Sequence, residues 1–163
     1  DIVHIVLIGG IAMEQFIVFI NNGQHFALDI SKIERIIEFE QPKKIPEASD
    51  YLLGVIQHNG EILPIIDLTK RLYNNDSVNS DSKKVIVATW KEKQMGFVVE
   101  DIKEISNFES TQYEKMNQDI SISKAYIKGF IKTNDDIIIV LDINQLFTLE
   151  QEKEIREGIE YAL

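Results

Sequence analysis

Short apolar runs separated by polar turns dominate this chain. Residues 16–20 and 26–30 are two such runs with β-branched and aromatic side chains, and they flank the polar turn Asn21, Asn22 and Gly23. Runs of this length and composition, bounded by turn residues, predict short β-strands. Eight further runs predict strands in the same way, at residues 33–39, 53–57, 61–66, 85–89, 95–99, 102–108, 127–132 and 137–141.

A tight turn is indicated at Asn59 and Gly60, between the strands predicted at residues 53–57 and 61–66. An Asn-Gly pair between apolar runs is a strong hairpin signal because both central residues of such a turn need positive φ. We therefore expect a β-hairpin with Asn59 and Gly60 at its tip.

The pattern occurs twice along the chain, which indicates a duplication. Residues 16–39 align without gaps with residues 85–108, and residues 51–72 align with residues 126–147. Identical residues recur in register in the second alignment, including Tyr51 with Tyr126, Gly54 with Gly129, Asn59 with Asn134, and Asp67 with Asp142.

The duplication predicts two units, at about 15–73 and 83–148, joined by a polar linker at 74–82. Each unit contains five predicted strands. Closure into a barrel hides the edges of short antiparallel strands. We therefore expect an all-β fold made of two pseudo-duplicated five-stranded β-barrels that share a core.

Three segments predict helices, at residues 68–73, 143–147 and 149–163. Asp67 and Asp142 directly precede the first two, and an Asp in this position is a natural N-cap because its carboxylate accepts from unpaired backbone N–H groups. The third segment is expected to dock on a barrel with its acidic face in solvent. Its apolar face is predicted to contain Leu149, Ile155, Ile159 and Ala162.

The start of the chain has a different character. Residues 2–12 form an apolar run that follows Asp1 and has no basic n-region. The run is shorter than the roughly 20 residues that cross a bilayer as a helix. We interpret Met13 as the natural start and residues 1–12 as upstream or leader sequence. No other window predicts a membrane span.

Composition narrows the range of functions. The 163 residues include 27 acidic and 17 basic side chains, for a formal charge of −10, and no cysteine. Such a charge repels phosphate backbones and anionic lipid surfaces, which argues against nucleic acid as a partner and against membrane insertion. The absence of cysteine excludes disulfides and thiolate metal sites, and it fits a reducing cytosol.

No catalytic group is assembled in the sequence. The three histidines, His4, His25 and His58, are far apart and are read as surface residues. There is no metal-ligand spacing, no glycine-rich phosphate loop and no nucleophile elbow. The acidic pairs at residues 100–101 and 135–136 are predicted to lie in solvated turns. We therefore expect a noncatalytic binding module with no metal and no cofactor.

Two stretches resemble a known family. Residues 26–36 read FALDISKIERI, residues 51–68 read YLLGVIQHNGEILPIIDL, and residues 95–102 and 126–131 supply the second-half counterparts. The combination resembles the signatures of the CheW-like chemotaxis coupling proteins, and the resemblance runs from about residue 15 to residue 147.

This resemblance implies a fold of two five-stranded SH3-like β-barrels with an apolar seam. It also implies an adaptor that couples a CheA-type histidine kinase, through its regulatory domain, to the cytoplasmic tips of methyl-accepting chemotaxis receptors. Such a protein would be cytoplasmic, at receptor arrays near the inner face of the membrane, and monomeric when free. The receptor tip would dock in a groove between the barrels, and the matching positions are Ile33, Arg35, Leu53, Gly54, Asn59, Gly60, Val85, Gly96 and Ile105.

The sequence departs from the family pattern at two of these positions. Asn59 stands where the family signature carries an arginine, and Arg35 stands where well-known members carry the glutamate that pairs with it. The usual ion pair is therefore absent. A surface pair contributes at most about 1 kcal/mol to stability, whereas rim charges act on partner choice. We expect Arg35 to face an acidic group on its partner.

Two alternatives remain open at this point. One is a CheW-like regulatory domain that belongs to a longer CheV-type or kinase protein. The other is a small-molecule-binding barrel or an unrecognised enzyme, in which the groove between the barrels would hold a ligand. The sequence offers no convergent polar cluster for such a ligand.

Overall fold

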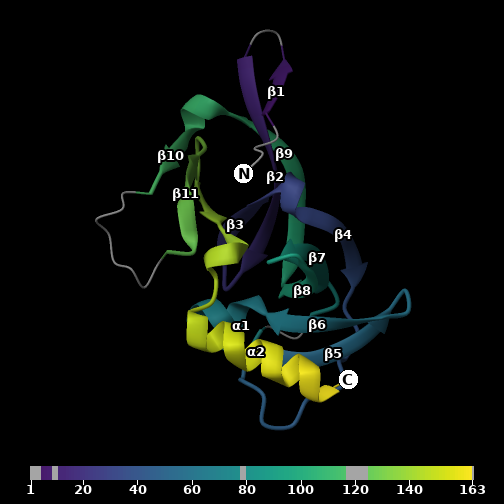
Figure 1. Cartoon of the computed structure of the whole chain (residues 1–163). Coiled ribbons are helices and arrows are strands. Elements are labelled where there is room, and N and C mark those ends of the chain that lie inside the picture. The colour runs from purple at the N-terminus through teal and green to yellow at the C-terminus, as the bar shows by residue number, and fades with distance from the viewer. Residues whose placement is uncertain (1–4, 9–10, 78–79, 117–124, 163) are drawn as a thin grey trace.

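The computed structural model describes residues 5–8, 11–77, 80–116 and 125–162, with side chains for residues 13–77, 80–116 and 125–160. Strands make up most of the described chain (Figure 1). The strands are β1 (Ile5–Ile8), β2 (Ile11–Asn21), β3 (Gln24–Asp29), β4 (Ile33–Glu38), β5 (Leu52–His58), β6 (Glu61–Asp67), β7 (Lys84–Trp90), β8 (Lys93–Val99), β9 (Asp101–Glu109), β10 (Tyr113–Lys115), β11 (Ile127–Lys132) and β12 (Ile137–Leu141). The helices are η1 (Ile30–Lys32), α1 (Leu68–Tyr73), η2 (Ser110–Gln112), η4 (Ile143–Gln145) and α2 (Leu149–Ala162).

The strands form two sheets. The seven-stranded sheet has the order β1-β2-β3-β12-β11-β10, and β9 also pairs with β2. The five-stranded sheet has the order β4-β7-β8-β6-β5. Figure 1 shows the first sheet in the upper half of the molecule and the second in the lower half. The predicted all-β fold and each of its ten predicted strands are confirmed.

The sheets do not follow the predicted contiguous units at 15–73 and 83–148, and this assignment is corrected. The first two strands of each repeat combine with the last three strands of the other repeat. Thus β9 pairs with β2, and its repeat counterpart β4 pairs with β7. Similar apolar runs can pair equally well with either copy, so the sequence repeat indicates the strands but not their partners.

Equivalent residues of the two repeats make equivalent backbone hydrogen bonds. The N–H of Asp67 donates to the Tyr51 carbonyl at 2.8 Å, and the N–H of Asp142 donates to the Tyr126 carbonyl at the same distance. Asp67 Oδ1 accepts from the Lys70 N–H, and Asp142 Oδ1 accepts from the Asn144 N–H. Both aspartates therefore cap the helices that follow them, as predicted, although the second helix is a single 3₁₀ turn, η4.

The described residues form three apolar clusters, and one of them, the shared core, joins the two sheets. The shared core draws buried side chains from both sheets and from α2, among them Phe19, Phe97 and Ile155. Each of the other two clusters lies within one sheet. The five-strand core lies in the five-stranded sheet, and the seven-strand core lies in the seven-stranded sheet. The five-strand core consists of Ile56, Leu63, Ile65, Val85, Val87 and Val98, and the seven-strand core of Phe16, Val18, Ala27, Phe108, Ile131, Ile138 and Val140.

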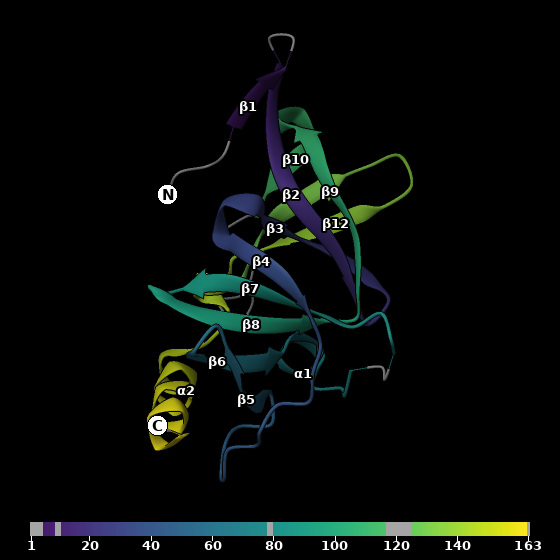
Figure 2. The same ribbon diagram turned by 90° about the vertical axis from the view of Figure 1, so that its right-hand side faces the viewer.

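The terminal helix α2 lies beside β5 and β6 (Figure 2). Ile155 is fully buried in the shared core and Ile159 packs against it. Leu149 is 83% exposed, so its predicted place on the buried face is wrong, and the side chain of Ala162 lies outside the described residues. The prediction of a solvated acidic face is wrong at Glu152, which is buried and pairs with Lys91 at 2.7 Å.

Glu100 was predicted to lie in a solvated turn, but its side chain is buried. Its Oε1 accepts from the Asn22 N–H at 3.0 Å and its Oε2 accepts from the Thr69 hydroxyl at 3.0 Å. The carboxylate therefore joins the β2–β3 turn to α1. A buried charge needs such partners because leaving it unpaired costs several kcal/mol.

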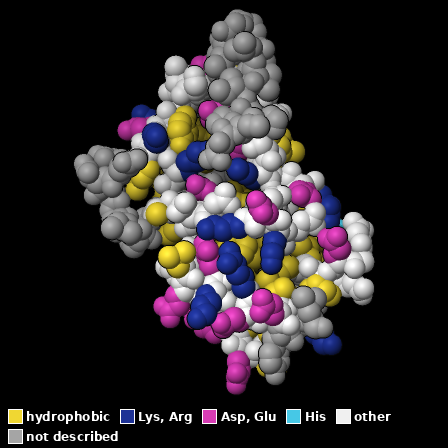
Figure 3. All heavy atoms as spheres, viewed as in Figure 1, with side chains coloured by type: hydrophobic (Ala, Val, Ile, Leu, Met, Phe, Trp, Pro, Cys, Tyr) yellow, Lys and Arg dark blue, Asp and Glu magenta, His cyan; other side chains and the backbone are white. Residues whose placement is uncertain are grey.

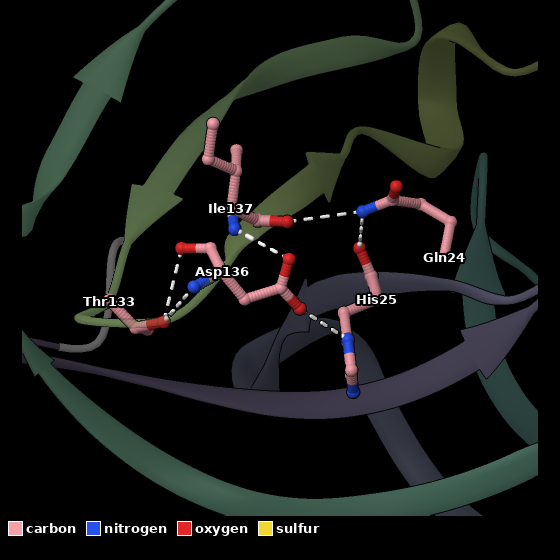
Figure 4. A network of polar contacts seen from close by, with 5 residues as sticks. All are labelled: Gln24, His25, Thr133, Asp136 and Ile137. Atoms are coloured by element: carbon pink, nitrogen blue, oxygen red, sulfur yellow. Dashed lines mark hydrogen bonds and ion pairs between the residues drawn. The ribbon is translucent and has the colours of Figure 1, made fainter.

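His25 and Asp136 form another polar network (Figure 4). His25 Nδ1 lies 2.5 Å from Asp136 Oδ2, and the Gln24 amide donates to the Ile137 carbonyl at 3.1 Å. These contacts connect the start of β3 to the β11–β12 turn. Since β3 and β12 pair in parallel over only two residue pairs, the network extends a short ladder. His25 therefore has a structural partner and is not simply a surface histidine.

The predicted leader and linker are described in part. Residues 1–4 and 9–10 of the leader, and residues 78–79 of the linker, lie outside the described residues. Strand β1 pairs with β2 from Ile5 with Glu14 to Ile8 with Ile11. In the linker, the Ser82 hydroxyl donates to the Glu100 carbonyl at 2.9 Å.

Candidate partner-binding surface

Arg35 is the centre of a polar group at one end of the five-stranded sheet. Its Nε–H donates to His58 Nε2 at 2.9 Å, and its Nη2 donates to Gln94 Oε1 at 3.3 Å. Glu34 Oε2 lies 3.9 Å from Nη1 and accepts from the Gln94 amide. The arginine is half-buried and its guanidinium is held by β5 and β8. It is thus presented in a defined orientation.

Local backbone geometry places these groups together. The β4–β7 pairing shifts register between Ile33 and Arg35. On the other side, His58 ends β5 directly before the turn at Asn59 and Gly60, whose φ angles are 52° and 79°. Two successive positive φ values are what a two-residue hairpin needs. The predicted hairpin is therefore present, and it brings His58 within reach of Arg35.

Three of the predicted groove residues support the sheet from within. Val85 is only 1% exposed and belongs to the five-strand core, and Leu53 packs against that core. A Cβ at Gly96 would lie 2.6 Å from a methyl group of Val85, so this position needs glycine for the strands to pack. The side chain of Val85 and the position of Gly96 are therefore closed to a partner.

Position 54 needs glycine for a different structural reason. Its φ is 145°, and a Cβ there would lie 2.1 Å from the carbonyl oxygen of Lys43. Lys43 pairs with Val55 in an isolated bridge, so the segment after β4 crosses directly over Gly54. At the repeat counterpart Gly129, a Cβ would lie 2.6 Å from the Glu114 carbonyl oxygen.

Ile105 lies on β9 in the seven-stranded sheet and is 57% exposed. Ile33 and Arg35 lie on β4 in the five-stranded sheet. A partner that contacts Ile105 and Arg35 together would span both sheets. The predicted positions that keep some exposure are Ile33, Arg35, Leu53, Asn59, Gly60 and Ile105.

The residues that hold Arg35 are not among the predicted site residues. His58 was read as a surface histidine, and Gln94 and Glu34 were not singled out. Gln94 lies opposite Thr89 in the β7–β8 pairing, and the Thr89 hydroxyl donates to Glu34 Oε1 at 2.9 Å. The proximity of His58 to Asn59 in the hairpin was an available signal, but the link to β8 depends on which strands pair.

No metal chemistry is built into the described part of the chain, which contains no group of three or more His, Cys, Asp or Glu side chains placed to hold an ion. None of the described helices has the length and apolar character needed to cross a membrane. The surface around Arg35 can bind a partner through shape, apolar contact and charge. Two sheets on a shared core, with a polar group fixed at one end, define a β-rich binding module.

Comparison with known proteins identifies the class. The sequence profile of the CheW-like domain matches residues 15–151. The chain is 30% identical over 139 residues to the chemotaxis protein CheW of Thermotoga maritima, an alignment that covers 83% of this chain and 87% of that protein. It is 24% identical over 141 residues to the chemotaxis protein CheW of Bacillus subtilis, covering 84% of this chain and 88% of that protein.

A solved structure agrees with these matches. The crystal structure of the scaffolding protein TtCheW from Thermoanaerobacter tengcongensis superposes with a TM-score of 0.77 at 25% identity, covering 85% of this chain and 94% of that one. The chain belongs to the CheW-like domain family. The predicted family is therefore confirmed, and with it a noncatalytic adaptor or scaffold role in chemotaxis.

Proposed function

We propose that this protein couples a CheA-type histidine kinase to the cytoplasmic tips of methyl-accepting chemotaxis receptors. The observation that carries the proposal is the family match over residues 15–151, together with the two-sheet fold shared with TtCheW. In this role the protein acts in the cytoplasm, at receptor arrays near the inner face of the membrane. It is monomeric when free and binds the regulatory domain of the kinase.

The receptor tip is proposed to contact the predicted groove positions that keep some exposure. Ile33 and Ile105 supply apolar contacts on the two sheets, and the Asn59–Gly60 turn supplies backbone groups. Val85, Gly54 and Gly96 act indirectly because they set the packing of the strands beneath the surface. A helical receptor tip laid across both sheets fits this distribution.

Arg35 is proposed to select the partner by charge. His58 and Gln94 fix its guanidinium, so little side-chain entropy is lost when a partner binds. Within the described residues Glu34 is the acid paired with it, at 3.9 Å, and both oxygens of this carboxylate already accept hydrogen bonds, from Thr89 and from Gln94. A partner carboxylate can therefore pair with Arg35 where the usual family ion pair is absent.

Binding titrations test the coupling role and the role of Arg35 separately. The wild-type chain is titrated against a CheA-type regulatory domain and against a receptor-tip fragment. Association is expected with both, with dissociation constants below about 1 mM. No detectable association with the kinase domain up to that concentration contradicts the coupling role.

Arg35→Glu is then compared with the wild type. We expect it to weaken receptor-tip binding by about tenfold or more, which is about 1.4 kcal/mol. The matched control is Lys153→Glu, which makes the same charge change at an exposed position on α2 and is expected to have no effect. If Arg35→Glu binds like the wild type while the wild type still binds both partners, the charge-selection hypothesis is wrong and the adaptor role stands.

A further inference from the structure

A cavity lies away from the Arg35 surface and shares no residue with it. It has a volume of about 300 Å³ and lies between the end of α1, the segment before β11, and the start of α2. Figure 3 shows Lys and Arg side chains gathered, among hydrophobic ones, in the middle of the face that carries α2. On a chain with a net charge of −10, this gathering is a local exception. The residues that line the cavity include Arg71, Lys91, Tyr126, Phe147, Leu149 and Glu152.

Arg71 is the cationic group of this cavity. Its guanidinium carbon lies 5.6 Å from the centre of the Tyr126 ring and 5.7 Å from the centre of the Phe147 ring. Two rings at this distance hold a guanidinium by cation–π attraction. Burial lowers the pKa of Arg71, but an arginine keeps its proton at neutral pH.

The orientation of Arg71 leaves one donor unused. Within the described part of the chain, its Nε is buried and has no hydrogen-bond acceptor. A buried N–H without an acceptor is unusual in a folded protein and calls for an explanation. The cation–π contacts hold the guanidinium in place, and because the Nε–H is shielded, it is the rest of the Arg71 head group that lines the cavity.

The other charges in the cavity cancel. Glu152 is buried and its carboxylate lies 2.7 Å from the Lys91 ammonium. The neutral pair neither repels an incoming carboxylate nor offers a second cation. Among the described residues Arg71 has no acidic partner, so the cavity offers one positive charge, which matches the single negative charge of a carboxylate.

An exposed apolar side chain lies at the rim of the cavity. Leu149 lines the cavity and is 83% exposed at the start of α2. A ligand that fills the cavity alone would leave Leu149 in water. A protein partner can place a carboxylate inside and cover the leucine with an apolar neighbour.

We infer that this cavity binds a Glu or Asp side chain of a protein partner, whose carboxylate pairs with the Arg71 guanidinium while an adjacent apolar side chain covers Leu149. The acidic side chain enters between the Tyr126 and Phe147 rings and the Lys91–Glu152 pair. This site is a second anchor, distinct from the Arg35 surface. It does not require that the partner be the kinase or the receptor.

The test uses the ¹⁵N-labelled full chain and the peptide acetyl-Leu-Glu-Leu-amide as probe. The Nε–H cross-peak of Arg71 is assigned by its loss in Arg71→Met. We expect the peptide to move this cross-peak saturably, with a dissociation constant of about 1 mM. The matched peptide acetyl-Leu-Gln-Leu-amide lacks the charge and is expected to bind about tenfold more weakly. Equal shifts with the two peptides overturn the proposal.

Two controls distinguish the source of the carboxylate and the contribution of Arg71. Sodium acetate at the same concentration is expected to move the cross-peak much less. If acetate matches the peptide, the cavity takes free carboxylates and the partner inference is overturned. Lys70→Gln removes one charge from the same helix at a side chain that bonds Asp76, and it is expected to bind the peptide normally. Unchanged peptide binding in Arg71→Met, followed at backbone amides around Leu149, also overturns the proposal.

Discussion

Gly54 shows how single residues set the geometry on which the surface depends. Its φ of 145° is disfavoured for other residues, and a Cβ there would lie 2.1 Å from the Lys43 carbonyl oxygen. Gly60 also has positive φ, at 79°, but no atom lies within 4 Å of a Cβ placed there. A substitution at Gly54 therefore meets both backbone strain and steric overlap, whereas a substitution at Gly60 meets backbone strain alone.

Gly54→Ala is expected to lower the free energy of unfolding by about 3 kcal/mol or more, because backbone strain and overlap with Lys43 add. Gly60→Ala is expected to lower it by about 1 kcal/mol, from the positive φ alone. Urea denaturation followed by circular dichroism measures both. Equal losses in the two variants contradict the close approach of Lys43 to Gly54.

At the scale of elements, the repeated aspartates provide a matched pair. Asp67 and Asp142 both accept a backbone N–H from the helix that follows, but Asp67 Oδ1 also accepts from the Ser77 hydroxyl. Asp67 therefore ties α1 to the linker as well as capping it. The sequence repeat indicated the shared role, whereas the extra bond depends on how the linker folds back.

Asp142→Ala is expected to lower the free energy of unfolding by about 1 kcal/mol, because the helix cap is lost. Asp67→Ala is expected to lower it by about 2 kcal/mol, because the hydrogen bond from Ser77 is lost together with the cap. Thermal and urea unfolding measure the difference. Asp67→Asn keeps an acceptor oxygen and serves as the control, with a smaller loss than alanine. A loss as large as that of alanine would show that the charge, and not the cap, stabilises α1.

At the scale of the whole molecule, the exchange of strands between repeats makes the two sheets interdependent. Each sheet needs strands from both halves of the chain, and the shared core contains side chains from both sheets and from α2. Glu100 adds a polar link between the β2–β3 turn and α1. The chain should therefore unfold in one cooperative transition.

Fragments test this interdependence. We expect residues 13–77 and residues 80–163 to lack a cooperative unfolding transition when separate, because each lacks partners for its strands. Mixed in equal amounts, they are expected to regain the transition and the near-ultraviolet circular dichroism of the intact chain. Cooperative unfolding of the fragment 13–77 alone would instead support contiguous barrels.

The sequence by itself determined the strands, the hairpin at Asn59 and Gly60, the two capping aspartates, the duplication and the family. These features depend on residues close together in the chain or on a pattern that one strand carries alone. Only the tertiary structure decided which strands pair, because the two repeats offer equivalent apolar runs. The same pairing decides that Arg35 meets His58 and Gln94, that Val85 is buried, and that the Arg71 guanidinium lies against the Tyr126 and Phe147 rings. Such contacts join residues far apart in the sequence, and local patterns carry no information about them.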